Sequence, residues 1–202
     1  MKQIRPAVLA AVLGLAALSS QTLAADPPMA PAAQIAAMPR CVWAKAADYD
    51  RNAVRSAADA LNLAAVDVLM SHLADDSAAL ARQCAPGVER NVRTRSRLML
   101  LGFNQEAMAD LIERDLGLKR ERLDQAIAAA PPEIIAGLRE TADKAGPRRY
   151  PGPLPAMGPI FTALGQPTYD GPPPTKTAFW IASYLMNSFQ LRAAAETFAP
   201  SP

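Results

Sequence analysis

The spacing of apolar residues constrains the fold of this chain more than any other sequence feature. Between residues 50 and 73, apolar side chains recur at alternating intervals of four and three residues, which places them on one face of a single long helix. The stripe consists of Val54, Ala58, Leu61, Ala65, Val68 and His72. No segment of the sequence has the two-residue alternation that is typical of a half-buried strand. The sequence therefore predicts an all-α protein.

Helix starts and stops divide the rest of the chain in the same way. Proline, glycine and capping residues separate short stretches of helical periodicity. The predicted helices cover residues 41–47, 50–73, 75–84, 88–101, 104–116, 123–130, 132–145 and 176–197. Asn104 is expected to cap the fifth helix, and Gly117 to end it in the left-handed conformation. We therefore expect six to eight helices in one compact, bundle-like domain spanning residues 41–202.

Two proline-rich stretches flank these helices. Residues 25–40 carry four prolines and little charge, which is typical of a flexible leader. Residues 146–175 contain nine prolines and five glycines, so we expect an irregular strap with one helical turn near residues 161–164. The helix that follows, 176–197, is apolar almost all round, and a soluble helix of that kind belongs in a protein core. The strap is therefore expected to return the chain to the bundle.

The N-terminus has the pattern of a secretory signal peptide. Lys2 and Arg5 precede an apolar run over residues 7–18, which is shorter than the ~20 residues that a membrane span needs. Cleavage is predicted after Ala24, so residues 1–24 would be removed and the protein would be periplasmic or secreted. Removal of two of the 21 basic residues leaves 19, equal to the 19 acidic residues. Because the mature chain is neutral, it is not expected to bind nucleic acid. It is also expected to have no transmembrane segment.

The two cysteines, Cys41 and Cys84, are expected to form a disulfide, because an exported chain matures in an oxidising compartment. Two free buried thiols remain the alternative. Since the predicted helix over 50–73 is long and the next is short, residues 41–50 would have to double back along the long helix for the sulfurs to meet. That path would place Trp43 against the apolar stripe.

His72 is the candidate for a reactive side chain. Asp75 and Asp76 follow it by three and four residues, and a carboxylate beside an imidazole would raise its pKa and set its tautomer, as a general base requires. The alternative is structural: His72 ends the apolar stripe, and the aspartates cap the next helix. With one histidine and two cysteines, the sequence predicts neither a zinc site nor another metal or cofactor site.

Arg90, Arg93, Arg95 and Arg97 form the one local run of charge, and Arg90, Arg93 and Arg97 of these would share a helix face. Such a face could hold a phosphate, a carboxylate or a lipid headgroup; a solvated surface is the alternative. Four glutamates lie on different predicted helices, and the sequence does not say whether any two converge. They are Glu106, Glu113, Glu121 and Glu133.

These features favour a non-catalytic exported protein that binds another protein or a component of the cell envelope. The common hydrolase and nucleotide-binding motifs are absent from the sequence, and residues 150–153, Tyr-Pro-Gly-Pro, could present a preformed recognition segment. The alternative is a helical enzyme or small-ligand-binding protein. Its pocket would lie between helices and use His72 with nearby acids, or the face of Arg90, Arg93 and Arg97.

Overall fold

The computed structural model describes residues 30–76, 78–145, 157–171 and 174–198. In these residues the chain forms α-helices, one short 3-10 turn and no strand, which confirms the all-α class. The elements are α1 (Ala32–Lys45), α2 (Asp48–Asp59), α3 (Leu63–Asp76), α4 (Ala78–Cys84), η1 (Val88–Arg90), α5 (Val92–Leu116), α6 (Arg120–Ala128), α7 (Pro132–Ala145), α8 (Gly158–Ala163) and α9 (Lys176–Phe198). The described residues thus hold nine α-helices, one more than the six to eight expected. One predicted helix is split into α2 and α3, two are merged into α5, and α8 forms in the strap.

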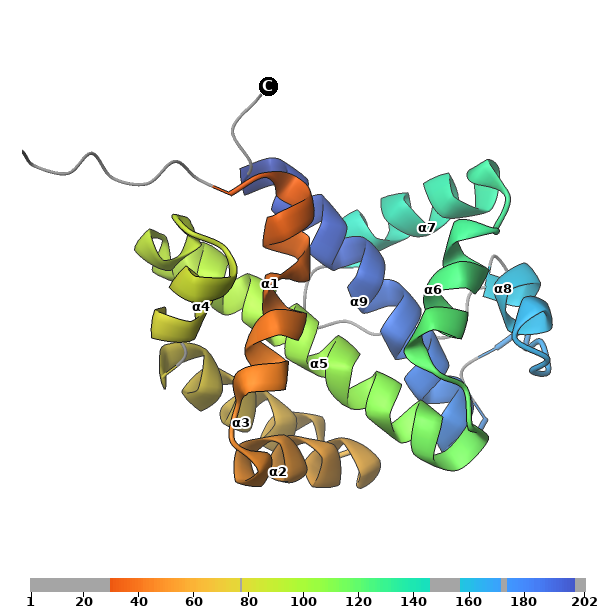
Figure 1. Ribbon diagram of the computed structural model, residues 1–202. Coiled ribbons are helices and arrows are strands. Elements are labelled where there is room, and N and C mark those ends of the chain that lie inside the picture. The colour runs from red at the N-terminus through yellow and green to blue at the C-terminus, as the bar shows by residue number, and fades with distance from the viewer. Residues whose placement is uncertain (1–29, 77, 146–156, 172–173, 199–202) are drawn as a thin grey trace, which may run out of the picture.

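Helices α5 and α9 pack against each other along the centre of the molecule (Figure 1). Helices α1, α2 and α3 cover α5 on one side, and α7 packs against α9. Every residue of α9 from Trp180 to Leu191 is buried, including the rings of Trp180, Tyr184 and Phe189. This confirms that the last helix is a core element, as its apolar circumference predicts. None of the described helices combines the length and the apolar character needed to cross a bilayer.

Helix α5 is one continuous helix, where the sequence predicted two. It is capped by Asn91, whose side chain accepts a hydrogen bond from the Thr94 N–H, and it passes through Asn104 without interruption. The prediction that Asn104 caps a new helix is therefore wrong. The predicted end is correct, because Gly117 follows the helix with φ = 66°, in the left-handed region that glycine adopts without strain.

The single long helix predicted over residues 50–73 is in fact two helices, α2 and α3, which pack against each other. The chain turns at Leu61, whose φ of 54° is incompatible with a continuing right-handed helix. The Asn62 side chain then accepts a hydrogen bond from the Ala65 N–H and starts α3. The predicted stripe consequently changes face at the turn: Val54 and Ala58 are buried, but Leu61, Val68 and His72 are exposed.

Helix α1 extends much further toward the N-terminus than predicted, since it begins at Ala32 and not at residue 41. Ile35 and Met38 are fully buried, and the Ala30 N–H donates to the Pro86 carbonyl. The expected flexible leader over 25–40 is thus wrong for residues 30–40, which are anchored by apolar burial that composition alone does not reveal. Residues 25–29 and the predicted signal peptide lie outside the described residues.

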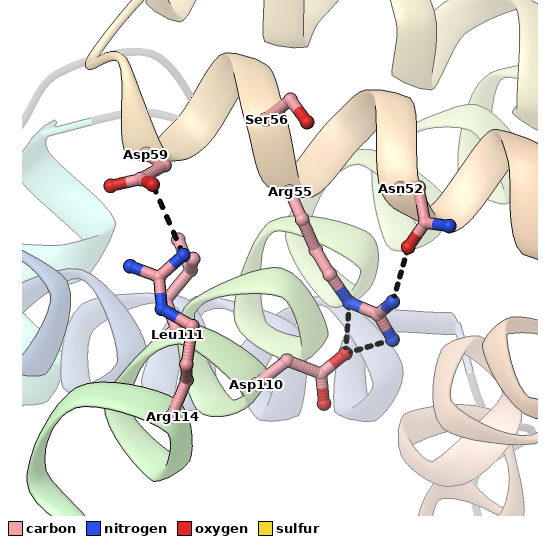
Figure 2. A pocket seen from close by; sticks show the side chains of 7 residues that line it. All are labelled: Asn52, Arg55, Ser56, Asp59, Asp110, Leu111 and Arg114. Atoms are coloured by element: carbon pink, nitrogen blue, oxygen red, sulfur yellow. Dashed lines mark hydrogen bonds and ion pairs between the residues drawn. The ribbon is translucent and has the colours of Figure 1, made fainter.

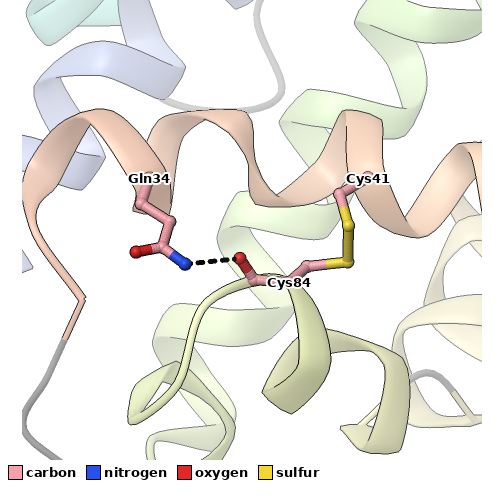
Figure 3. Close-up of a disulfide and its surroundings, with 3 residues drawn as sticks. All are labelled: Gln34, Cys41 and Cys84. Carbon is pink, nitrogen blue, oxygen red and sulfur yellow. Dashed lines mark hydrogen bonds between the residues drawn. A yellow bond between two sulfur atoms is a disulfide. The ribbon is translucent and has the colours of Figure 1, made fainter.

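Cys41 and Cys84 form a disulfide between α1 and α4, as predicted, with Cα atoms 5.8 Å apart (Figure 3). Gln34, on α1, donates a hydrogen bond of 3.0 Å to the Cys84 carbonyl, a second link between the two helices. The predicted path is wrong, because α1 packs against α4 and α5 and the helix it would follow ends at Asp59. The ring centroid of Trp43 lies 5.6 Å from that of Phe103 on α5.

The described part of the predicted strap, residues 157–171 and 174–175, contains α8 where one helical turn was expected. Phe161 is buried and meets the ring of Tyr169 edge-on, with centroids 5.9 Å apart. Arg122 of α6 donates to the Ala163 carbonyl at the end of α8. The strap is therefore packed against α6, while residues 146–156, which include the predicted recognition segment 150–153, lie outside the described residues.

Candidate functional site

His72 and the predicted arginines lie on separate elements: His72 on α3, Arg90 on η1, and Arg93 and Arg97 on α5. His72 lies exposed on α3 and lines neither of the two pockets described below. The side chains of Asp75 and Asp76 are outside the described part of the structure. Arg90 lies in the 3-10 turn, whereas Arg93 and Arg97 are exposed on α5. The predicted arginine face is thus reduced to two side chains one helical turn apart, because the chain does not become helical until Val92.

The first pocket, of about 390 Å³, lies between α2 and α5. Figure 2 shows one arginine reaching across from each helix toward an aspartate on the other. Arg55 on α2 holds Asp110 through its Nε at 2.7 Å and its Nη2 at 2.6 Å. Arg114 on α5 donates to Asp59 at 3.0 Å. Each helix supplies one arginine and one aspartate to these two pairs, so two positive and two negative charges meet at the interface.

Aromatic rings and further polar groups hold the two arginines of this pocket in place. The Arg55 guanidinium lies 5.7 Å from the centroid of Trp43, whose Nε1 donates to Asp110 at 3.3 Å. Arg114 lies 5.7 Å from the ring centroid of Trp180. Its hydrogen bond to Asp59 holds the pKa of that carboxyl below the usual range. These groups are engaged with one another, which suits a latch between α2, α5 and α9.

The second pocket, of about 200 Å³, lies where α1, α5, α6 and α9 meet. Its lining residues are Ala33, Ala36, Ala37, Arg40, Gln105, Glu106, Arg120, Asp124, Ser188, Leu191 and Arg192. The Glu106 and Arg120 side chains form an ion pair with only 6% and 14% of their surface exposed. Arg40 reaches both carboxylates, at 3.8 Å from Glu106 and 3.2 Å from Asp124. The pocket therefore holds a charged network in which the Glu106–Arg120 pair is buried and Arg40 and Asp124 are partly exposed.

Tyr184 and Gln105 extend this network into the core. The Tyr184 hydroxyl donates to Asp124 at 2.6 Å, and burial together with this hydrogen bond raises the pKa of the tyrosine. Gln105 donates to the Ser188 hydroxyl at 2.6 Å, and Ser188 in turn donates to the Tyr184 carbonyl. Because each buried group has a partner, these helices are held in one relative position.

Burial raises the pKa of Glu106 above its ordinary value of 4.5, although Arg120 and Arg40 oppose the shift. The folded protein therefore holds this proton more tightly than the unfolded chain does. The contribution of Glu106 to folding is then fully present below pH 4.5 and is lost as the pH rises through its folded pKa. Of the four scattered glutamates, Glu106 alone is buried; Glu113, Glu121 and Glu133 are exposed.

Sequence reasoning missed the second pocket, because its charged residues come from four helices and share no local pattern. Arg40 was assigned to a leader, and although Arg120 and Asp124 are only four residues apart, nothing in the sequence indicates that they meet Arg40 and Glu106. The one available signal was a set of polar residues, Ser188 and Gln190 among them, within an otherwise apolar last helix. Among the described residues, no three His, Cys, Asp or Glu side chains converge as metal ligands.

The outward side of α3 is the other feature of note. Nine of its fourteen residues are Ala, Val, Leu or Met, yet Ala64, Val68 and Ser71 are exposed, with 58% of Val68 accessible. Leu61, in the turn before the helix, is 40% exposed. Ala64 and Val68 are four positions apart and so lie on one face of α3, with Leu61 exposed in the turn before it; these three residues are called the α3 strip below. Comparison with protein-family models, with curated proteins and with solved structures found no match to this chain.

Proposed function

We propose that the mature chain is an exported, non-catalytic protein that binds another protein or a component of the cell envelope through the outward strip of α3. The observation that carries this proposal is the exposure of Ala64 and Val68 on α3, a predominantly apolar helix, and of Leu61 in the turn before it. Apolar side chains on a helix are normally buried, so an uncovered apolar strip marks a surface suited to contact with a partner. His72 and Ser71 lie beside the strip and would supply polar contacts at its edge.

Binding is favoured over catalysis because acidic side chains in the two pockets are already paired with arginines. The carboxylates of Asp59, Asp110 and Asp124 are each held by at least one arginine. A carboxylate engaged in this way is a poor general base, because the ion pair stabilises its charged form. The same contacts stabilise the helix interfaces, which supports a rigid scaffold presenting the α3 strip.

Export is supported by the signal-peptide pattern and by the Cys41–Cys84 disulfide, which persists in oxidising compartments. Intact-mass measurement of the protein isolated from its native cells tests this part. We expect a chain that begins at Ala25 and lacks two hydrogens relative to the reduced form. A full-length mass, or two thiols that react with an alkylating reagent in the native protein, would contradict it.

A matched pair of variants tests the binding surface. Ala64→Asp and Ala136→Asp each add one charge at an exposed alanine, but the first lies on α3 and the second on α7, on the opposite side of the molecule (Figure 1). The purified mature proteins would be cross-linked to the native envelope fraction. We expect the wild type and Ala136→Asp to give the same cross-linked partner, and Ala64→Asp and Val68→Asp to lose it. Equal cross-linking by all four proteins would refute the proposed surface.

A further inference from the structure

The pocket between α1, α5, α6 and α9 carries more positive than negative charge. Three arginines line it, Arg40, Arg120 and Arg192, against two carboxylates, Glu106 and Asp124. Its surplus is therefore one positive charge. Such a surplus in a concave site attracts a small anion more strongly than the same charge on a flat surface would.

The carboxylates already have their partners, but one arginine does not. Glu106 is paired with Arg120 and approached by Arg40, and Asp124 lies between Arg40 and the Tyr184 hydroxyl. Arg192 is exposed at the rim of the pocket and forms no ion pair with any residue that the structure describes. It lies one turn after Ser188, so both residues are on the pocket side of α9.

Part of the pocket wall is made of small side chains. Ala33, Ala36 and Ala37 on α1 line the pocket. The resulting volume, about 200 Å³, is smaller than the ~300–1,000 Å³ of pockets for drug-sized ligands. It accommodates a small molecule, a single side chain or the end of a peptide.

We propose that this pocket binds a carboxylate, held between Arg192 and Arg40 above the buried Glu106–Arg120 pair. A carboxylate carries one negative charge, equal to the surplus of the pocket, and its two oxygens match the planar fork of a guanidinium. A doubly charged phosphate would exceed the surplus and would be repelled by Glu106 and Asp124. The site is separate from the α3 strip, so this inference does not depend on the proposed function.

Titration of the mature protein with sodium acetate, followed by NMR of the arginine Nε–H signals, tests the site. Sodium chloride at equal ionic strength serves as the reference for screening by salt. We expect acetate, and not chloride, to shift the Arg192 and Arg40 signals in a saturable manner. Equal shifts with the two salts would overturn the proposal.

Two variants separate the pocket from general charge effects. Arg192→Gln should weaken acetate binding by about tenfold or more, equivalent to ~1.4 kcal/mol. The matched control, Arg139→Gln, removes one exposed arginine from α7 and should leave the affinity unchanged. Ala33→Leu keeps every charge but fills the pocket, and should also weaken binding. If Arg192→Gln and Ala33→Leu bind acetate as the wild type does, the carboxylate is not held here.

A short peptide with a free C-terminus, compared with its C-terminal amide, distinguishes the two sources of the carboxylate. Tighter binding of the free peptide than of acetate, with no binding of the amide, would identify the site as one for a chain terminus. Equal affinity for acetate and the free peptide would identify a site for small free carboxylates. Binding of the amide as tightly as the free peptide would refute recognition of a carboxylate.

Discussion

Replacing Gly102 by alanine should destabilise the protein, although alanine is the better helix former. Gly102 lies inside α5, where a glycine costs roughly 0.5–1 kcal/mol relative to alanine. An added Cβ would overlap the Cβ and Cγ atoms of Pro39 and would lie 3.4 Å from its Cα. Carbon atoms normally touch at ~3.5–4.0 Å, so α1 would have to move away from α5 by about 1.5 Å.

That movement is opposed by the packing of α1 and by its disulfide. Pro39 is buried within α1, and Cys41, two residues later, is linked by the disulfide to Cys84. Overpacking of this kind costs typically 1–3 kcal/mol, and more where the backbone is restrained. After the gain in helix propensity is subtracted, we expect a net loss of about 2 kcal/mol. For a chain of this size, that loss lowers the melting temperature by about 4–8 °C.

Gly137→Ala is the matched control, because Gly137 lies within α7 and an added Cβ there meets no atom within 4 Å. It should raise the melting temperature, measured by far-UV circular dichroism on the oxidised mature protein, whereas Gly102→Ala should lower it. Pro39→Gly removes the overlapping atoms, so adding Gly102→Ala in that background should cost little or even stabilise. If Gly102→Ala alone stabilises the protein as Gly137→Ala does, α1 does not cross α5 at this point.

Three further changes test other parts of the structure. Replacing Cys41 and Cys84 by serine should cost roughly 4 kcal/mol in urea unfolding, because the disulfide closes a loop with a sequence separation of 43; an unchanged midpoint would contradict the linkage. Glu106→Gln should destabilise the protein more below pH 4.5 than at neutral pH, since the contribution of Glu106 is greatest when its carboxyl is protonated in both states; the opposite trend in melting temperature would contradict the raised pKa. Truncation before Thr175 removes α9 and should abolish cooperative melting, because large buried aromatics are worth ~3–5 kcal/mol each against a total stability of ~5–15 kcal/mol; a truncated chain that melts like the wild type would refute the core role of α9.

Two features of the fold follow from the sequence because they depend on short-range physical chemistry. Helix α9 is buried because its side chains are apolar almost all round, and no arrangement of the other helices could expose it without a large loss of stability. Gly117 ends α5 because glycine adopts a positive φ without a steric penalty. Both signals are contained within a few turns of one helix.

The disulfide follows from an even simpler argument. Two cysteines in a chain predicted to be exported have one possible pairing within that chain, and the structure forms it. The route by which the two cysteines meet was not predictable in the same way, because it depends on the turn at Leu61. Leucine carries no signal for a positive φ, so the break between α2 and α3 is imposed by the packing of the two helices on α5.

Tertiary structure alone decided the remaining features. Asn104 is a good cap at a helix start, yet it lies inside α5, because the helix is held on both sides by α1 and α9. Residues 32–40 have the composition of a leader, but the burial of Ile35 and Met38 against the core makes them helical. Propensity differences of less than ~1 kcal/mol per residue are easily outweighed by such burial.

The charged pocket was beyond the reach of sequence reasoning for the same physical reason. Arg40, Glu106, Arg120 and Arg192 lie on four helices, and nothing local to any of them favours the others. In the sequence, each is a charged residue of a type that is usually exposed. Only the packing of the helices brings their side chains close to one another. The sequence by itself therefore determined the fold class, the bridge and the core helix, whereas long-range packing determined which charges meet and where a ligand could bind.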